Sequence, residues 1–277
     1  MSIDLWQAAL LGVVQGLTEF LPISSAGHLI LAPALLGWGD SPLTRLDFTV
    51  ALHIGTLIAL LVVFWADFLG LLEALVLAVL HRSLADPNVR LALLIALATI
   101  PGALAGAFFE RAIEASLRSP ATGGVMMVSI GLLMGAADRW SLRHRDEQSL
   151  RPIGALAVGM AQAMAIVPGV SRSGITIAVG LALGLTRSAA ARFSFLLSAP
   201  IVAGAAIKEG LDLARGGGLN NSELTAYAVG IGAAAVSGFL AIRWLLAYLA
   251  RGSLAPFVIY RLLVGGTVIV LAFGGRL

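Results

Sequence analysis

The chain has 277 residues, of which 59% are hydrophobic and 12% are charged, and its mean hydropathy is +0.96. This composition excludes an ordinary soluble domain and predicts an all-α polytopic membrane protein. The net charge of +3 does not indicate a nucleic-acid partner, because the arginines lie mostly in short connectors, where they act as topology signals. The absence of cysteine excludes disulfides and thiolate metal sites.

The first apolar region, 3–37, is interrupted in its middle by Pro22 and by small polar residues. Each half is too short to cross a bilayer, so we predict a re-entrant helix, turn and helix. Region 152–184 is interrupted in the same way at 168–174. No cleavable signal peptide is expected, because the first four residues lack a basic leader and Glu19 falls inside the first apolar stretch.

Uninterrupted apolar segments long enough to cross the membrane are predicted at 48–66, 91–109, 121–137, 192–207, 224–248 and 257–274. The stretch 67–80 is apolar except for Asp67 and Glu73. It either extends the first span obliquely or forms a separate interfacial helix.

The two interrupted regions resemble each other, and the segments after them also correspond. We therefore predict two repeats, about 1–138 and 152–277, joined by a cytoplasmic connector at 139–151. Each repeat would hold one re-entrant hairpin and three spans, and the odd number of crossings would invert the second repeat. Inverted repeats place paired broken helices at a shared central site.

Arginine counts test this topology. The connectors 81–90, 138–151, 185–192 and 250–255 would share one side, and together they carry nine arginines. The opposite side carries six basic residues. The positive-inside rule therefore favours placing the first group in the cytoplasm and both chain ends outside.

Polar side chains gather at residues 15–28, in an otherwise apolar part of the chain; they include Gln15, Glu19, Ser24, Ser25 and His28. A carboxylate at the centre of a bilayer costs about 2.5–3.5 kcal/mol or more, so its default interpretation is a functional site facing a polar cavity. This cluster is the expected seat of the chemistry.

Two motifs stand out, namely Gln15-x-x-x-Glu19 followed by PISSAGH at 22–28, and PGVSRSGIT at 168–176. Both resemble motifs of the undecaprenyl-diphosphate phosphatase family, the bacitracin-resistance type of integral membrane phosphatase. The resemblance implies removal of the terminal phosphate from a C55 polyprenyl diphosphate at the outer face of the bacterial cytoplasmic membrane, which recycles the lipid carrier of cell-wall synthesis and confers bacitracin resistance. It also implies a divalent cation, Mg²⁺ or Ca²⁺, with Glu19 and Gln15 as ligands. Gln15 departs from the family, in which this position is often Glu.

Hydrolysis of a diphosphate needs positive charge for the phosphate oxygens, a nucleophile held in line and control of protons. Arg172 offers a planar fork that suits two phosphate oxygens. Ser24, Ser171, Ser173 and Thr176, with backbone N–H groups at a helix start, are candidate phosphate ligands.

Three further residues are candidates for the reaction itself. Glu19 is the candidate general base or metal ligand, and His28 the candidate proton donor or acceptor. Ser25 is the candidate covalent nucleophile, although direct attack by water stays open. His53 and Arg261 are weaker candidates, and we interpret His53 as a donor between helices.

Two other classes of protein remain to be weighed. A secondary transporter or polyprenyl-lipid translocase would share the broken helices, but it needs no nucleophile. A purely structural scaffold would leave the buried polar residues without a purpose. The expected partners are the polyprenyl diphosphate and membrane lipids, and a homodimer is suggested by small-residue spacing at Gly102, Gly106, Gly131 and Gly135.

Overall fold

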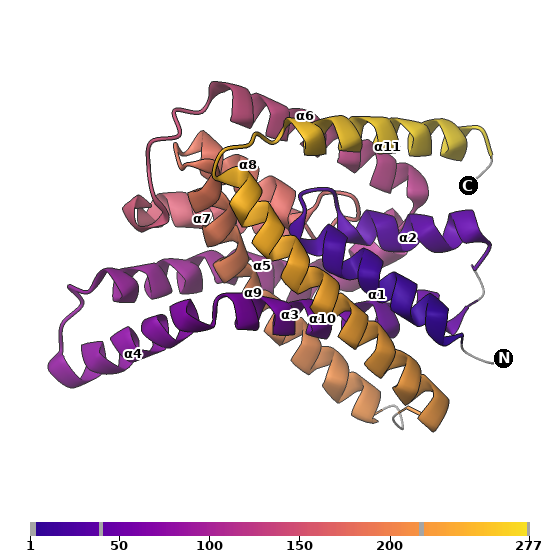
Figure 1. Cartoon of the computed structure of the whole chain (residues 1–277), viewed down its shortest axis with the longest axis horizontal. Helices are drawn as coiled ribbons and strands as arrows, with labels where there is room; N and C mark the ends of the chain where they lie inside the picture. The colour runs from indigo at the N-terminus through magenta and orange to yellow at the C-terminus, as the bar shows by residue number, and fades with distance from the viewer. Residues whose placement is uncertain (1–3, 39–40, 216–218, 276–277) are drawn as a thin grey trace.

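Helices account for most of the fold in the computed structural model, which describes residues 4–38, 41–215 and 219–275. The described residues form eleven α-helices: α1 Leu5–Phe20, α2 Ser25–Leu36, α3 Leu46–Val63, α4 Trp65–His81, α5 Pro87–Leu117, α6 Pro120–Trp140, α7 Pro152–Met164, α8 Arg172–Ala182, α9 Arg187–Arg215, α10 Asn221–Leu249 and α11 Ala255–Phe273. Figure 1 shows α6 lying beside α11, and α10 crossing the molecule obliquely toward α1.

Five helices of the described chain are long and apolar enough to span a membrane, namely α5, α6, α9, α10 and α11. They confirm the spans predicted at 91–109, 121–137, 192–207, 224–248 and 257–274. The chain is therefore an all-α polytopic membrane protein.

The sixth predicted span, 48–66, ends earlier than expected, because α3 stops at Val63 and the chain turns by 75° into α4. The stretch 67–80 is thus a helix of its own and does not continue α3 in line. Asp67 lies in the first turn of α4, where a negative charge complements the helix dipole. Its carboxylate pairs with Arg192 at the start of α9, which ties α4 to that helix.

Both interrupted regions form a helix, a turn and a second helix, as predicted. The first hairpin is α1 and α2, and the second hairpin is α7 and α8. Ser24 and Ser171 cap the second helix of each, with φ angles of 79° and 68°. Their Oγ atoms accept hydrogen bonds from Gly27 N at 3.3 Å and Gly174 N at 3.1 Å. The two turns are built alike.

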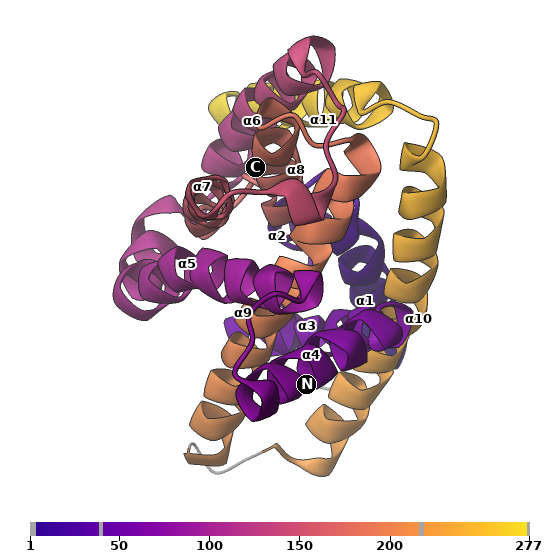
Figure 2. The same cartoon turned by 90° about the vertical axis from the view of Figure 1, so that its left-hand side faces the viewer.

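The order of helices recurs along the chain, since a short hairpin begins each half and long helices follow. Each hairpin packs against a long helix from the other half, α1 along α10 and α7 along α5. Figure 2 shows α1 with α10 on one side, and α5 with α7 on the other. The two proposed repeats, about 1–138 and 152–277, and their inversion in the membrane remain predictions.

The arginine-rich connectors meet at one end of the molecule. Arg187 Nε donates to Asp138 Oδ1 at 2.5 Å, and the same carboxylate accepts Leu254 N at 3.0 Å. Arg90 donates to the carbonyl of Leu150 at 2.8 Å. These contacts join all four segments that the charge count assigned to one side.

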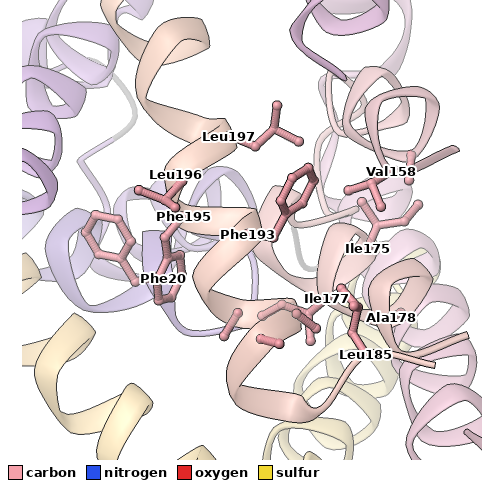
Figure 3. Close-up of a cluster of buried hydrophobic side chains, with 14 of the residues drawn as sticks. Phe20, Val158, Ile175, Ile177, Ala178, Leu185, Phe193, Phe195, Leu196 and Leu197 are labelled. Carbon is pink, nitrogen blue, oxygen red and sulfur yellow. The ribbon is translucent and has the colours of Figure 1, made fainter. Parts of the chain in front are cut away.

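The second hairpin lies inside the protein. Nearly every residue of α8 is buried, and its apolar side chains pack against α7 and α9 (Figure 3). Phe20, at the end of α1, reaches the same cluster and contacts Phe195 edge to face, with ring centroids 5.5 Å apart. This core fixes the end of α1 against α8 and so determines where the polar residues of both hairpins meet.

Glycines let α1 approach α10 closely. A Cβ atom on Gly16 would lie 2.0 Å from Ser237 Oγ and 2.5 Å from the carbonyl oxygen of Ala234. The glycines weighed for a dimer contact mostly face neighbours within the chain, since Gly102 lies near Gln162 and Gly131 near Arg261. Dimer formation stays a prediction.

We expect Gly16→Ala to destabilise the protein by about 1–3 kcal/mol, because α1 and α10 must separate to admit the methyl group. The control is Gly232→Ala on α10, where a Cβ atom meets nothing within 4 Å. Thermal unfolding in detergent compares the two variants. Equal midpoints for both would contradict the close packing of α1 on α10.

Candidate active site

Glu19 is the centre of the polar cluster. Its side chain, which is 7% exposed, sits in the last turn of α1. Oε2 accepts hydrogen bonds from Ser25 Oγ at 2.6 Å and from Gln15 Nε2 at 3.1 Å, and Oε1 pairs with the guanidinium of Arg172. The structure therefore brings four of the predicted site residues together.

The ends of two helices create this pairing. A carboxylate in the last turn of a helix is disfavoured by the helix dipole, whereas the start of a helix carries positive partial charge. Arg172 begins α8, so its guanidinium and the dipole of α8 both compensate Glu19. The pair crosses from the first hairpin to the second.

The backbone at Ser24 directs Ser25 toward Glu19. A non-glycine residue at positive φ costs about 1–3 kcal/mol, and such residues concentrate at functional sites. Because Ser24 holds this conformation as the N-cap of α2, Ser25 begins the helix beside the end of α1. The strain is located in the residue that precedes the candidate nucleophile.

In this structure Ser173 contacts the first hairpin, and Ser171 lies beside it. Ser173 Oγ is 3.2 Å from the carbonyl oxygen of Glu19 and 3.3 Å from that of Leu21. It also lies 3.3 Å from Ser171 Oγ, which caps Gly174. Their predicted role as phosphate ligands stays a prediction.

Thr176 lies deeper than expected for a residue that binds substrate. It is 1% exposed, and its hydroxyl lies 2.7 Å from the carbonyl oxygen of Arg172 and 2.6 Å from Ser194 Oγ. The contact with Ser194 holds α8 against α9, and the one with Arg172 lies within α8. A direct contact with phosphate would require this hydroxyl to leave both partners.

His28 is bound away from the carboxylate. Its Nδ1 is 2.7 Å from the carbonyl oxygen of Ser24, and its Nε2 is 2.6 Å from Tyr260 Oη on α11. Both residues line an apolar groove of about 440 Å³ between α2 and α11. The structure does not show His28 in contact with Glu19 or Arg172, and its role as a proton donor stays a prediction.

His53 belongs to the cluster, although the sequence favoured a packing role for it. Its Nε2 lies 3.5 Å from Glu19 Oε2, and its Nδ1 is 2.9 Å from the carbonyl oxygen of Thr49. An ionisable residue inside a predicted span was the available signal. The sequence did not show which face of α3 packs against the first hairpin.

His53 also lines a cavity of about 250 Å³, which therefore reaches the polar cluster around Glu19. Ala26 of the first hairpin and Pro168 of the second line it, and Glu110 and Arg118 from the end of α5 add charged groups. Most of the other lining residues are apolar. The cavity can therefore admit a ligand that joins a polar group to a hydrocarbon chain.

Arg261 holds the two turns together. It is fully buried and donates to the carbonyls of Pro22 at 3.3 Å, Gly169 at 2.9 Å and Val170 at 3.1 Å. A further bond, 3.0 Å long, reaches the carbonyl of Met127 on α6. This role was missed by sequence reasoning, which offered only the signal of an arginine within a predicted span.

The protein side chains at this site can hold a metal ion only if substrate phosphates supply further ligands. Among the described residues, no three His, Cys, Asp or Glu side chains come together. Gln15 Oε1, however, is buried beside Glu19 and has no hydrogen-bond partner. Mg²⁺ is commonly held by one or two protein oxygens plus substrate phosphates, so these two residues fit such a site.

The fold and this cluster define a polytopic membrane protein in which a serine hydroxyl, a buried carboxylate and an arginine meet between two hairpins. The chain belongs to the family described as bacitracin resistance protein BacA, whose model matches residues 8–267.

The curated relatives are similar over nearly their whole length. An undecaprenyl-diphosphatase of Geobacter sulfurreducens is 48% identical over 276 residues, which cover 98% of this chain and 99% of the relative. A protein of the same name from Pelobacter propionicus is 45% identical, and the match covers 98% of this chain and 98% of the relative. Another, from Desulforudis audaxviator, is also 45% identical, and the match covers 96% of this chain and 97% of the relative.

We expect Arg261→Met to lower the free energy of unfolding by about 3 kcal/mol or more, because three turn carbonyls lose their buried donor at about 1–3 kcal/mol each. Arg251→Met, at an exposed position between α10 and α11, is the matched control. Unfolding in detergent, followed by circular dichroism, measures both. An Arg261→Met protein as stable as the control would show that the turns do not depend on this guanidinium.

Proposed function

We propose that this protein hydrolyses undecaprenyl diphosphate to undecaprenyl phosphate and inorganic phosphate. The observation that carries the proposal is the 2.6 Å hydrogen bond from Ser25 Oγ to Glu19 Oε2, with Arg172 on the other carboxylate oxygen. The relatives named undecaprenyl-diphosphatase support the choice of substrate.

In the proposed reaction, Ser25 Oγ attacks the terminal phosphorus and Glu19 Oε2 takes the hydroxyl proton. The bond from that phosphorus to the bridging oxygen breaks, and the lipid phosphate leaves with the electron pair and receives the proton from Glu19. Water then cleaves the phosphoserine; one of its protons returns to Ser25, and the other stays on the released phosphate. Arg172 binds the phosphate oxygens on which negative charge gathers.

A transporter or lipid translocase is the alternative, and it is not favoured. Transport requires binding and passage, whereas a hydroxyl held on a buried carboxylate is specifically useful for transferring a phosphoryl group. The named relatives are diphosphatases, which also supports hydrolysis.

We propose Mg²⁺ or Ca²⁺ as the cofactor, held by Glu19 and Gln15 together with the diphosphate. When bound, the cation supplies positive charge that neutralises phosphate oxygens. The orphaned Gln15 Oε1 supports this assignment. An amide oxygen can bind a cation, but it cannot act as a base, so Glu19 remains the base.

The proposed location is the bacterial cytoplasmic membrane, with the site open to the outer or periplasmic side. The excess of arginine in the connectors that meet at Asp138 and Leu150 supports this orientation. There the reaction would recycle the lipid carrier of cell-wall synthesis and confer bacitracin resistance.

The direct test is phosphate release from C55 polyprenyl diphosphate by purified protein in detergent with Mg²⁺ or Ca²⁺. We expect Ser25→Ala and Glu19→Gln each to lower kcat by about 10²–10⁴-fold, since each removes one partner of the proton transfer. Ser129→Ala is the control, because that exposed hydroxyl only contacts the carbonyl of Val125 in its own helix. Acid-quenched protein should carry phosphate on Ser25.

A folded Ser25→Ala protein with undiminished kcat would instead establish direct attack by water. No release by folded wild-type protein with either metal would refute the phosphatase proposal. Transport of the lipid diphosphate across vesicles would then test the alternative.

We expect Gln15→Glu to lower the Mg²⁺ concentration for half-maximal activity by about tenfold, because a second carboxylate beside Glu19 attracts the cation more strongly. Gln7→Glu makes the same change two turns earlier in α1 and should leave the metal dependence unchanged. A chelator should abolish phosphate release by the wild type, and added Mg²⁺ should restore it. Full activity in chelator would exclude the cation requirement.

A further inference from the structure

His28 and Tyr260 form a contact that the proposed reaction does not use. They lie 232 positions apart in the chain, on α2 and α11. Tyr260 Oη is 2.6 Å from His28 Nε2, and the two rings stack with centroids 5.6 Å apart and planes inclined by 15°. Such a contact fixes both the position and the rotation of the imidazole.

The partners of His28 determine which ring nitrogen carries the proton. The carbonyl oxygen of Ser24, 2.7 Å from Nδ1, can only accept a hydrogen bond, so Nδ1 must donate. In the neutral ring Nε2 is then an acceptor, and Tyr260 Oη must donate to it. The carbonyl of Ser24 therefore selects the tautomer, and Tyr260, whose hydroxyl can donate or accept, satisfies the other ring nitrogen and holds the ring in this position.

The carbonyl of Ser24 lies in the turn that presents the nucleophile. It already accepts the backbone N–H of His28 at 3.2 Å, as expected in the first turn of a helix. The ring Nδ1–H adds a second donor to this oxygen. Because Ser24 has a φ of 79°, the extra bond stabilises a strained residue directly before Ser25.

Helix α11 reaches this turn with two consecutive residues. Arg261 donates to the carbonyl of Pro22, and Tyr260 reaches Ser24 through His28. The surroundings of Tyr260 are apolar, since Leu31 and Val264 line the same groove. A hydrogen bond in such surroundings is stronger than one in water.

We propose that Tyr260 is a positioning residue, which holds the His28 ring so that Nδ1–H braces the Ser24 carbonyl and keeps Ser25 aligned with Glu19. His28 then contributes to the reaction as part of the brace. The inference rests on the proposed function for its readout of activity, whereas the tautomer of His28 can be measured without any substrate.

The first experiment compares Tyr260→Phe with Tyr248→Phe. Tyr248 Oη also donates a hydrogen bond, to the carbonyl of Ser253 at 3.0 Å, but it lies at the turn between α10 and α11 and serves as the matched control. We expect Tyr260→Phe to lower kcat about tenfold with KM unchanged, and the control to keep both values. Equal kcat in both variants would overturn the proposal.

The second experiment records ¹⁵N spectra of the histidine rings, with a His28→Ala protein to assign the signal. We expect wild-type His28 to show one neutral tautomer, protonated at Nδ1, and Tyr260→Phe to show a mixture. An unchanged tautomer in Tyr260→Phe would count against the brace. If wild-type protein releases no phosphate, the proposed function fails, and this spectrum alone decides the role of Tyr260.

The third experiment separates a brace from an acid. The amide N–H of His28→Asn takes the place of Nδ1–H, whereas that of His28→Gln takes the place of Nε2. We expect His28→Asn to retain at least about tenfold more kcat than His28→Gln or His28→Ala. In the His28→Ala background, Tyr260→Phe should have no further effect. Equal loss in all three His28 variants, or an additive effect of Tyr260→Phe, would refute the proposal.

Discussion

The buried guanidinium of Arg261 is the interaction on which the rest of the site depends. A helix that breaks inside a membrane leaves backbone carbonyls without partners, and no lipid group can supply donors. Arginine carries five N–H donors in a rigid fork, and Arg261 directs them at Pro22, Gly169 and Val170. One side chain therefore supplies hydrogen-bond donors to carbonyls at both interruptions. Without it, each turn would have to find its own donors, and the two turns would lose the one side chain that bonds to both of them.

Once the turns meet, the charges of the site follow from the helix ends. The end of α1 brings Glu19 to the start of α8, where Arg172 neutralises it. This pairing also suggests how substrate starts the reaction. In the proposed reaction, a diphosphate would compete for the guanidinium of Arg172, and as that contact is shared, more of the negative charge of Glu19 would become available to the proton of Ser25. Without substrate, the ion pair with Arg172 thus offsets the free-energy cost of burying the Glu19 carboxylate.

The length of the apolar segments and the positions of helix-breaking residues were the two signals in the sequence that predicted the fold. Five spans and both hairpins follow from these two signals. The bend after Val63 was left open, as an oblique extension of the span or a separate helix, because the residues on both sides of it are apolar apart from Asp67 and Glu73. His53 and Arg261 were undervalued for a different reason: their importance depends on which face of a span meets a distant turn. Contacts such as that of Arg261 with Pro22, 239 positions away, leave no trace in local periodicity.

The likeness of the two hairpins shows how one backbone can carry two different roles. Gln15 and Gln162 occupy matching places, but four residues later the first hairpin has Glu19 where the second has Ile166. After the capping serines the hairpins differ again, because Ser24 is followed by the neutral Ser25, whereas Ser171 is followed by the cationic Arg172. The candidate base and the candidate nucleophile therefore come from one hairpin, and the guanidinium comes from the other. Since neither hairpin holds all of these groups, the proposed reaction requires that both be docked, and it would depend on the contacts that dock them as much as on the groups that perform it.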